Sequence, residues 1–144
     1  MQLWIAEKPS VAKAICAELG IVKKGAGFNE CKGGNTVTWC FGHLLEQAGP
    51  DAYTPDDVPV TKKGGKIWRM QDLPIFPSVW KLNVKRDRGV KTQLRTIKTL
   101  LTKADSIVNC GDPDREGQLL VDEILEFYKC RKPVSRFWAV SYTH

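Results

Sequence analysis

Apolar residues fall in short runs and at helical spacing along the chain, and the two patterns alternate. Runs rich in apolar and β-branched residues predict four strands, at residues 2–6, 36–41, 106–110 and 134–140. Between these runs, apolar residues recur every three or four positions, which predicts helices at residues 9–19, about 94–101 and 117–128. Because strands alternate with helices, we expect an α/β domain with a mainly parallel sheet.

Two segments lack this periodicity. Residues 25–35 are rich in glycine and asparagine, and we expect them to form a turn. Residues 49–66 contain three prolines followed by a Lys/Gly stretch at 62–66, and this composition predicts a loop. The sequence contains no internal repeat, so the pattern describes one domain rather than a repeat array.

Composition narrows the class of protein. The chain has 144 residues, 42% hydrophobic and 26% charged, which suits one compact globular domain. Lysine and arginine exceed the acids by 22 to 16, and the net charge of +6 favours a polyanionic partner. The sequence has no apolar run long enough to span a membrane, and its first residues are apolar over too short a stretch for us to expect a signal peptide. Its five cysteines form no CxxC pair, which indicates buried, reduced thiols and a cytoplasmic protein.

Acidic residues follow the first and third predicted strands. Glu7 ends the first strand, and Asp112, Asp114 and Glu116 follow the third on a turn into a helix. Ligands of parallel α/β sheets gather at the carboxyl ends of the strands, so we expect these acids to meet. Two carboxylates about 4 Å apart repel by roughly 4 kcal/mol at an effective dielectric near 20, and a divalent cation reverses that sign. Oxygen-only ligands suit Mg²⁺, which can polarise a phosphoryl oxygen.

The same residues have simpler interpretations. The acidic residues can also form an ordinary solvent-exposed turn in which Asp114 caps the following helix. Lys8 either contacts a phosphate or is an exposed lysine at a helix start, where the helix dipole disfavours it. Arg115 either binds phosphate or pairs with Glu116.

Three ordered motifs carry a resemblance to a known family. They are IAEKPS at residues 5–10, GHLLE at 42–46 and GDPDREGQL at 111–119. Together they resemble the Toprim domain of a type IA DNA topoisomerase, with bacterial topoisomerase III as the closest branch. The resemblance covers about residues 1–140, with a basic loop or insertion at about 49–90 and an unmatched tail at 141–144.

The resemblance implies a fold and a set of roles. The fold is a Rossmann-like, mainly parallel four-stranded sheet flanked by helices. Glu7 resembles the catalytic acid/base and a metal ligand, and Lys8 resembles the phosphate-facing catalytic lysine. Asp112 and Asp114 correspond to the Mg²⁺ ligands, and Glu116 completes the acidic set.

Family chemistry implies single-strand DNA cleavage, strand passage and religation through a tyrosine in a later domain. The tyrosines of this chain, Tyr53, Tyr128 and Tyr142, match no motif for that nucleophile. We therefore expect the remaining topoisomerase domains to lie C-terminal to this region, and we expect the chain alone not to relax supercoiled DNA.

Basic residues concentrate in the middle of the chain. Between residues 62 and 103, 12 basic residues stand against Asp72 and Asp87, namely Lys62, Lys63, Lys66, Arg69, Lys81, Lys85, Arg86, Arg88, Lys91, Arg95, Lys98 and Lys103. Interleaved tryptophans favour single-stranded DNA, although a solvated basic face would give the same pattern. Trp68 and Arg69 are the first candidates for DNA contact, with Lys8 and Arg115 beside the acids.

The GHLLE run holds two supporting candidates. His43 either forms an ordinary hydrogen bond in a packed turn, or joins Glu46 in supporting the acidic site or contacting DNA. The leading hypothesis is thus a Mg²⁺-dependent Toprim module of a nucleoid- or plasmid-associated topoisomerase, acting without a nucleotide cofactor or a membrane. The alternatives are a non-cleaving DNA-binding remnant and another Toprim enzyme, a primase or nuclease. A dinucleotide-binding domain fits poorly because G-x-G-x-x-G is absent after the first strand.

Overall fold

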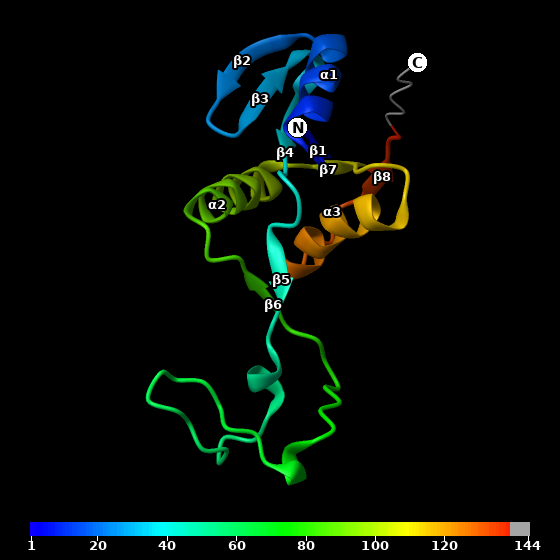
Figure 1. The fold of residues 1–144 in the computed structure, drawn as a ribbon. Helices are drawn as coiled ribbons and strands as arrows, with labels where there is room; N and C mark the ends of the chain where they lie inside the picture. The colour runs from blue at the N-terminus through cyan, green and yellow to red at the C-terminus, as the bar shows by residue number, and fades with distance from the viewer. Residues whose placement is uncertain (139–144) are drawn as a thin grey trace, which may run out of the picture. The chain divides into compact units, whose positions relative to one another are not determined.

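The computed structural model describes residues 1–138, and the chain forms two compact units (Figure 1). Unit 1 combines residues 1–45 with the chain from residue 84 onward. Unit 2 comprises residues 46–83. Each unit has its own set of stabilising contacts and is described in turn.

Unit 1 is built on a six-stranded sheet. Its order is β2 (Ile21–Gly25), β3 (Phe28–Cys31), β4 (Asn35–Trp39), β1 (Gln2–Ala6), β7 (Ser106–Cys110) and β8 (Val134–Arg136). The last four are parallel, and these are the four predicted strands. The predicted parallel α/β sheet is therefore confirmed, and β2 and β3 extend it as an antiparallel hairpin.

Helices cover both faces of the sheet because the strands are apolar on both sides. Helix α1 (Pro9–Leu19) packs Ala12 and Ile15 on the face that carries Ala6 and Val37. The opposite face carries α2 (Arg88–Lys103) and α3 (Arg115–Phe127). Gln93 of α2 donates to the Thr38 hydroxyl across 3.2 Å, and Asn109 on this face donates to Asp122 of α3 across 3.0 Å.

Two sequence expectations differ from the structure. A β-hairpin, with strands Ile21–Gly25 and Phe28–Cys31, occupies much of the segment expected to be a turn. The outer strand is almost wholly exposed, so it has no apolar face for the pattern to reveal. The last strand is shorter than expected, since Phe137 and Trp138 follow it in irregular backbone, and residues 139–140 lie outside the described residues.

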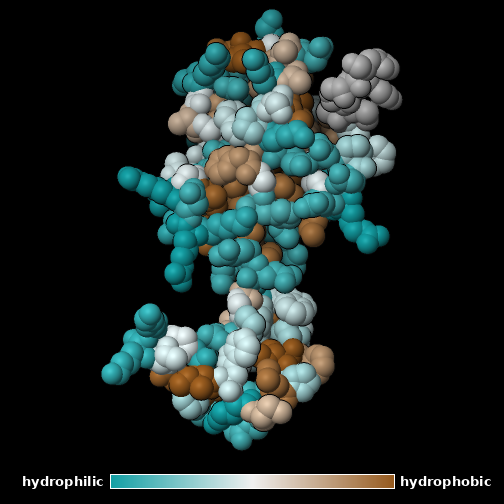
Figure 2. Space-filling model, viewed as in Figure 1, coloured by the Kyte–Doolittle hydropathy of each residue, from teal (hydrophilic) through white to brown (hydrophobic). Residues whose placement is uncertain are grey.

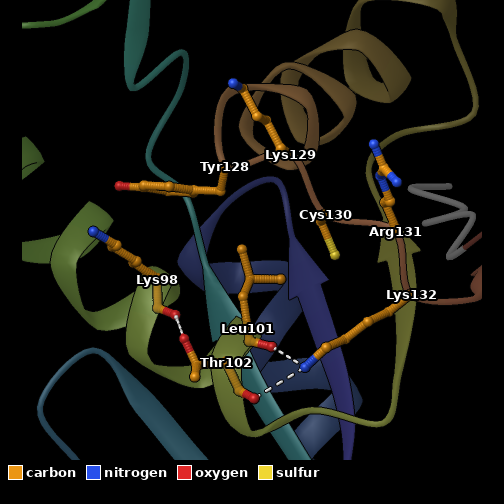
Figure 3. A pocket seen from close by; sticks show the side chains of 8 residues that line it. All are labelled: Lys98, Leu101, Thr102, Tyr128, Lys129, Cys130, Arg131 and Lys132. Atoms are coloured by element: carbon orange, nitrogen blue, oxygen red, sulfur yellow. Dashed lines mark hydrogen bonds between the residues drawn. The ribbon is translucent and has the colours of Figure 1, made fainter.

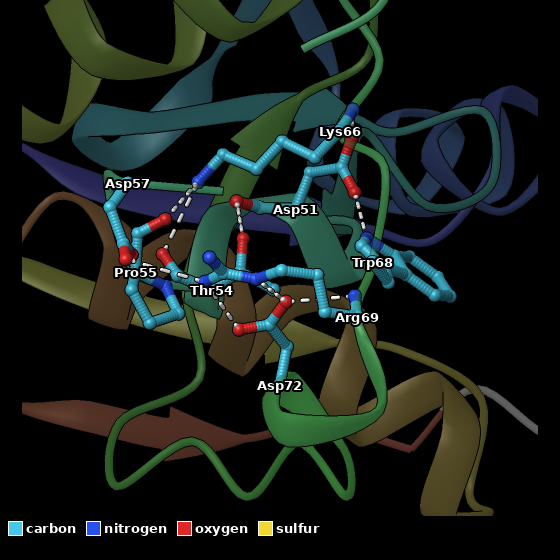
Figure 4. A network of polar contacts seen from close by, with 8 residues as sticks. All are labelled: Asp51, Thr54, Pro55, Asp57, Lys66, Trp68, Arg69 and Asp72. Carbon is cyan, nitrogen blue, oxygen red and sulfur yellow. Dashed lines mark hydrogen bonds and ion pairs between the residues drawn. The ribbon is translucent and has the colours of Figure 1, made fainter. Parts of the chain in front are cut away.

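Unit 2 is largely irregular, as predicted for residues 49–66. Its ends are formed by β5 (Leu45–Gln47) and β6 (Leu82–Val84), which pair as a two-stranded sheet, and it contains 3₁₀ turns at Pro50–Tyr53 and Met70–Asp72. A polar network substitutes for a large core (Figure 4). Asp51 accepts hydrogen bonds from the Trp68 indole at 2.7 Å and the Lys66 backbone N–H at 3.1 Å.

The cysteines behave as predicted. Cys16, Cys31, Cys40 and Cys110 are buried, and Cys130 is partly buried, all as free thiols. Burial raises the pKa of Cys31 to about 11 and of Cys110 to about 12, so these thiols pack as neutral apolar groups. Among residues 1–138, no helix has the length and apolarity needed to cross a membrane.

Candidate metal and catalytic site

The register of the central strands brings two predicted acids together. Ala6 of β1 is paired with Cys110 of β7, so the residues that follow these strands leave the same edge of the sheet. There the backbone N–H of Asp112 donates to Glu7 Oε2 across 2.9 Å. Residues 105 positions apart in the chain thus form one acidic corner, as the strand-end argument predicted.

A buried asparagine holds the acidic turn in shape. Asn109, 1% exposed, accepts the Gly111 N–H at 2.9 Å through its side-chain oxygen and donates to Asp122. Arg136 of β8 donates to the same Asn109 oxygen and, across 2.7 Å, to the Asp112 carbonyl. These bonds fix the backbone from which the Asp112 carboxylate projects.

Glycines allow β7 and α3 to approach closely here. A Cβ atom built on Gly111 would lie 2.0 Å from the Gly117 carbonyl oxygen. One built on Gly117 would lie 2.6 Å from both the backbone nitrogen and oxygen of Asp112, and 2.9 Å from Glu7 Oε2. Both positions therefore need glycine for packing, because side-chain atoms would overlap the backbone.

Lys8 faces the acids. Its ammonium lies 3.3 Å from Asp112 Oδ2, with the two side chains 49% and 32% exposed. The residue precedes α1 in extended backbone. Its position explains why a lysine is tolerated at a helix start, since an adjacent carboxylate offsets the unfavourable helix dipole.

The other two acids are engaged differently. Asp114 caps α3, with Oδ1 accepting the Gly117 N–H at 2.6 Å, so the capping interpretation of this residue is confirmed. Glu116 is 81% exposed and lies 3.4 Å from His43 Nε2. The other ring nitrogen of His43 lies 3.2 Å from Glu123. His43 therefore contacts two carboxylates of α3, those of Glu116 and Glu123.

The Glu7 charge also acts on the buried side of the site. Burial, together with the nearby Glu7 carboxylate, raises the pKa of Cys40 to about 12. Cys40 follows β4 and its backbone N–H donates to the Ala6 carbonyl at 2.9 Å. Cys40 therefore stays a neutral thiol in the neighbourhood of the Glu7 charge.

The carboxylates suit a hard divalent cation by chemistry. Among residues 1–138, no three His, Cys, Asp or Glu side chains converge as a ready metal cage. Mg²⁺ commonly uses only one or two carboxylates and fills its remaining positions with water and substrate phosphate. Glu7, which bonds to the Asp112 backbone, and Asp112 itself could supply such carboxylates, and Asp114 Oδ2 is unbonded to other described residues.

The remaining candidates lie elsewhere. Trp68 and Arg69 belong to unit 2, where Arg69 is paired with Asp72 at 3.0 Å and Asp57 at 3.4 Å. Arg115 is exposed at the first position of α3, without an ion pair among residues 1–138. Glu46 is an exposed residue of β5, at the start of unit 2.

Neither described tyrosine is placed as a free nucleophile. The Tyr128 hydroxyl donates to the Leu94 carbonyl at 3.3 Å, and burial raises its pKa. The Tyr53 hydroxyl accepts the Lys81 N–H at 2.8 Å inside unit 2. Tyr142 lies outside the described residues.

The sequence predictions did not include Arg136, Asn109 or Asp122. Asn109 carried a usable signal, because a polar residue inside a buried strand needs a partner. Arg136 carried none, since its role depends on how β8 is aligned with β7, where Asn109 is paired with Arg136. Asp122 lies between the apolar positions of the predicted helix, and this pattern identifies it only as a residue on the polar side of that helix.

The fold and the site define a class of protein. It is a doubly wound α/β domain with carboxylates at the carboxyl ends of adjacent central strands. A family model described as the Toprim domain matches residues 2–141, and the chain belongs to that family. The resemblance predicted from the three motifs is therefore confirmed.

Similar proteins carry the name DNA topoisomerase 3. Those of Haemophilus influenzae and Salmonella typhimurium are 49% and 50% identical over 128 residues, which is 88% of this chain and 18% of each relative. That of Bacillus subtilis is 38% identical over 143 residues, covering 96% of this chain and 18% of the relative. The chain thus spans less than a fifth of the length of these relatives.

Proposed function

We propose that this chain is the Mg²⁺-binding catalytic module of a type IA DNA topoisomerase, which cleaves and rejoins one DNA strand with a tyrosine supplied by another domain. The proposal rests on the Glu7–Asp112 corner, where the Asp112 N–H bonds to Glu7 across 2.9 Å. The similarity to proteins named DNA topoisomerase 3 supports it. Such an enzyme acts where DNA is, in the nucleoid or on plasmids.

Each side chain at the corner has a separate task. Glu7 and Asp112, with Asp114 and Glu116, would hold Mg²⁺, which neutralises phosphate charge when bound. Glu7, as a carboxylic acid, can give a proton to the 3′ oxygen that leaves phosphorus and take it back on religation. Lys8, 49% exposed beside Asp112, can turn its ammonium toward a phosphate oxygen.

The metal assignment can be tested directly. Titration calorimetry should detect Mg²⁺ binding to the unaltered chain and at least tenfold weaker binding to an Asp112→Asn/Asp114→Asn variant. The exposed pair Glu18→Gln/Glu126→Gln changes net charge equally and serves as the control. Equal binding by the first variant and the unaltered chain would exclude the proposed ligands.

Single-stranded DNA is the proposed substrate, with Trp68 of unit 2 as a stacking residue. Its indole nitrogen is held by Asp51 at 2.7 Å, while the side chain stays 45% exposed, so one ring face can meet a base. Exposed apolar side chains gather in unit 2 (Figure 2), including Met70 at 87% and Phe76 at 84%. Arg69 is already paired with Asp72, so its proposed contact with phosphate is the weaker part of this assignment.

Base stacking and charge predict different mutational behaviour. Trp68→Ala should weaken binding of an oligothymidine severalfold, and Trp68→Phe should restore most of it. Affinity should fall steeply with salt if phosphates contribute, whereas a salt-independent affinity would contradict phosphate contact.

Relaxation of supercoiled DNA by the purified chain would contradict the requirement for a separate tyrosine.

A non-cleaving DNA-binding module is the second candidate. It is favoured by one observation, that each acid is already engaged by a protein group and no three-ligand cage exists within residues 1–138. Under this alternative, DNA would bind while the Mg²⁺ titration gives the same result for the unaltered chain and the double aspartate variant.

A further inference from the structure

Helix α2 presents an unusual charge distribution. It carries five basic residues and no acidic one within Arg88–Lys103. Its apolar side, which includes Leu94 and Ile97, is buried against the sheet. The N-cap Asp87 uses its carboxylate to accept the Val90 N–H at 3.0 Å. The exposed side of the helix is therefore cationic along its length.

Four of the basic residues lie on one stripe. Arg88, Lys91, Arg95 and Lys98 follow one another at intervals of three, four and three, which places them on a single helix face. All four are exposed, and none forms an ion pair among residues 1–138. The stripe runs over the eleven residues from Arg88 to Lys98, a rise of about 15 Å at 1.5 Å per residue, which matches about four phosphate-to-phosphate steps of roughly 3.4 Å along one duplex strand.

This arrangement opposes helix stability. Neighbouring like charges at such spacing cost an isolated helix about 0.2–0.5 kcal/mol per pair, and the stripe has three such pairs. Arg88 and Lys91 also occupy the first turn, where the helix dipole disfavours cations and where this helix has no acid. Stability of the helix therefore does not account for the stripe, whereas a polyanionic partner does.

The stripe leads into a basic groove between the ends of α2 and α3 (Figure 3). The groove has a volume of about 330 Å³, and Lys98, Lys129, Arg131 and Lys132 line it without any acid. Lys98 lies 5.8 Å from the centre of the Tyr128 ring. The Lys129 and Arg131 side chains extend away from the carbonyls of α2 in Figure 3.

Lys132 removes the main obstacle to an anion at this position. The C-terminal end of a helix is negative, which repels phosphate. The Lys132 ammonium donates to the carbonyls of Leu101 at 2.5 Å and Thr102 at 3.0 Å, and also to that of Ala104. Since this cation satisfies the terminal carbonyls, the other basic groups of the groove are left for a ligand.

We propose that this basic face, defined as Arg88, Lys91, Arg95 and Lys98 with the groove residues Lys129 and Arg131, binds the phosphate backbone of duplex DNA. Its groove residues lie beyond the opposite end of α3 from the acidic corner, about 20 Å away for 13 helical residues. It is a second DNA contact, independent of sequence and of the metal. The inference takes from the proposed function only that DNA is the polyanion.

The test compares two triple variants of equal charge. Lys91→Gln/Arg95→Gln/Lys98→Gln removes the centre of the stripe, and Lys13→Gln/Lys23→Gln/Lys24→Gln removes three exposed lysines of α1 and β2. Glutamine keeps a helix propensity close to that of lysine and arginine, so folding should be retained, and circular dichroism checks this. Binding of a labelled 20-base-pair duplex is measured by anisotropy across a salt series.

The stripe variant should bind at least tenfold more weakly at 0.1 M salt. Its slope of log affinity against log salt should be smaller by about 2 to 3, since each lost phosphate contact removes about 0.9. The control variant should change affinity less than threefold. Equal weakening of both variants, or no weakening by the stripe variant, would overturn the proposal. Mg²⁺ titration of the stripe variant should match the unaltered chain, so failure here is distinguishable from failure of the metal site.

Discussion

Replacing Gly117 by alanine tests the close approach that forms the acidic corner. The added Cβ would lie 2.6 Å from two backbone atoms of Asp112 and 2.9 Å from Glu7 Oε2. Favourable contacts of a carbon atom lie near 3.5–4.0 Å, so the overlap is close to an ångström. The atoms in conflict belong mainly to backbone, which cannot rotate away as a side chain would.

Two opposing effects set the size of the change. Alanine is favoured over glycine inside a helix by about 1 kcal/mol. Overpacking costs about 1–3 kcal/mol, and a turn that moves away also loses the charge-assisted bond between the Asp112 N–H and Glu7, worth about 1.5–3 kcal/mol. The loss exceeds the gain, and we expect Gly117→Ala to lower the free energy of unfolding by about 2 kcal/mol.

Thermal unfolding and Mg²⁺ titration measure the two consequences. A loss of about 2 kcal/mol should lower the melting temperature by roughly 5–10 °C for a domain of this size. Mg²⁺ affinity should fall about tenfold because Asp112 moves away from Glu7. Gly49→Ala is the control, since its Cβ meets nothing within 4 Å and its φ of −65° suits any residue. If Gly117→Ala and Gly49→Ala have the same melting temperature and the same Mg²⁺ affinity, the close approach at Gly117 does not stabilise the acidic corner.

Three further predictions address single contacts. Arg136→Met should lower the unfolding free energy by about 1–3 kcal/mol in urea titration, because it leaves the Asp112 carbonyl and Asn109 short of donors, while the exposed Arg131→Met should change it little. The Lys8 ammonium and Mg²⁺ would compete for the Asp112 carboxylate, so Lys8→Met should tighten Mg²⁺ binding about twofold to fivefold, which is the contribution of an exposed ion pair. Weaker Mg²⁺ binding by this variant would contradict that competition. In unit 2, hydrogen bonds from the Lys66 N–H and the Trp68 indole lower the pKa of Asp51, and Arg69 lowers the pKa of Asp72. The stabilisation of the folded state by these two carboxylates is therefore complete above about pH 4, the pKa of an unfolded aspartate, and is lost as the pH falls below it. The Trp68 indole resonance should therefore titrate in that acid range, while that of Trp4, bonded to the neutral Asn35 at 3.0 Å, should not.

The sequence predicted the strands best where both faces of the strand are buried. The strands at Gln2–Ala6 and Ser106–Cys110 carry apolar residues on both faces because helices cover both sides of the sheet, and both strands were predicted at these bounds. The edge strand Ile21–Gly25 was missed because solvent surrounds it and leaves no periodic signal. β5 was missed because its pairing with β6 joins residues nearly 40 positions apart through an irregular segment.

The acidic corner was predictable from strand ends, whereas its support was not. Glu7 and Asp112 each follow a recognisable strand, and parallel strands present their carboxyl ends together. The bonds of Arg136 depend instead on the register of β8 against β7, which no local pattern encodes. The basic stretch from residue 62 to 103 is continuous in the sequence, yet in the structure it is divided between unit 2 and unit 1, where most of it lies on α2.

The gathering of four acids is explained by the groups that face them. Each carboxylate meets a different electropositive or neutral polar group: a backbone N–H for Glu7, the ammonium of Lys8 for Asp112, the helix N-terminus for Asp114 and the His43 ring for Glu116. These contacts offset part of the repulsion between the carboxylates. The Lys8 contact at Asp112 is a partly exposed ion pair, so it costs little to exchange. A cation arriving at Asp112 would therefore displace the Lys8 ammonium, and the released lysine would lie beside the phosphate that the cation attracts.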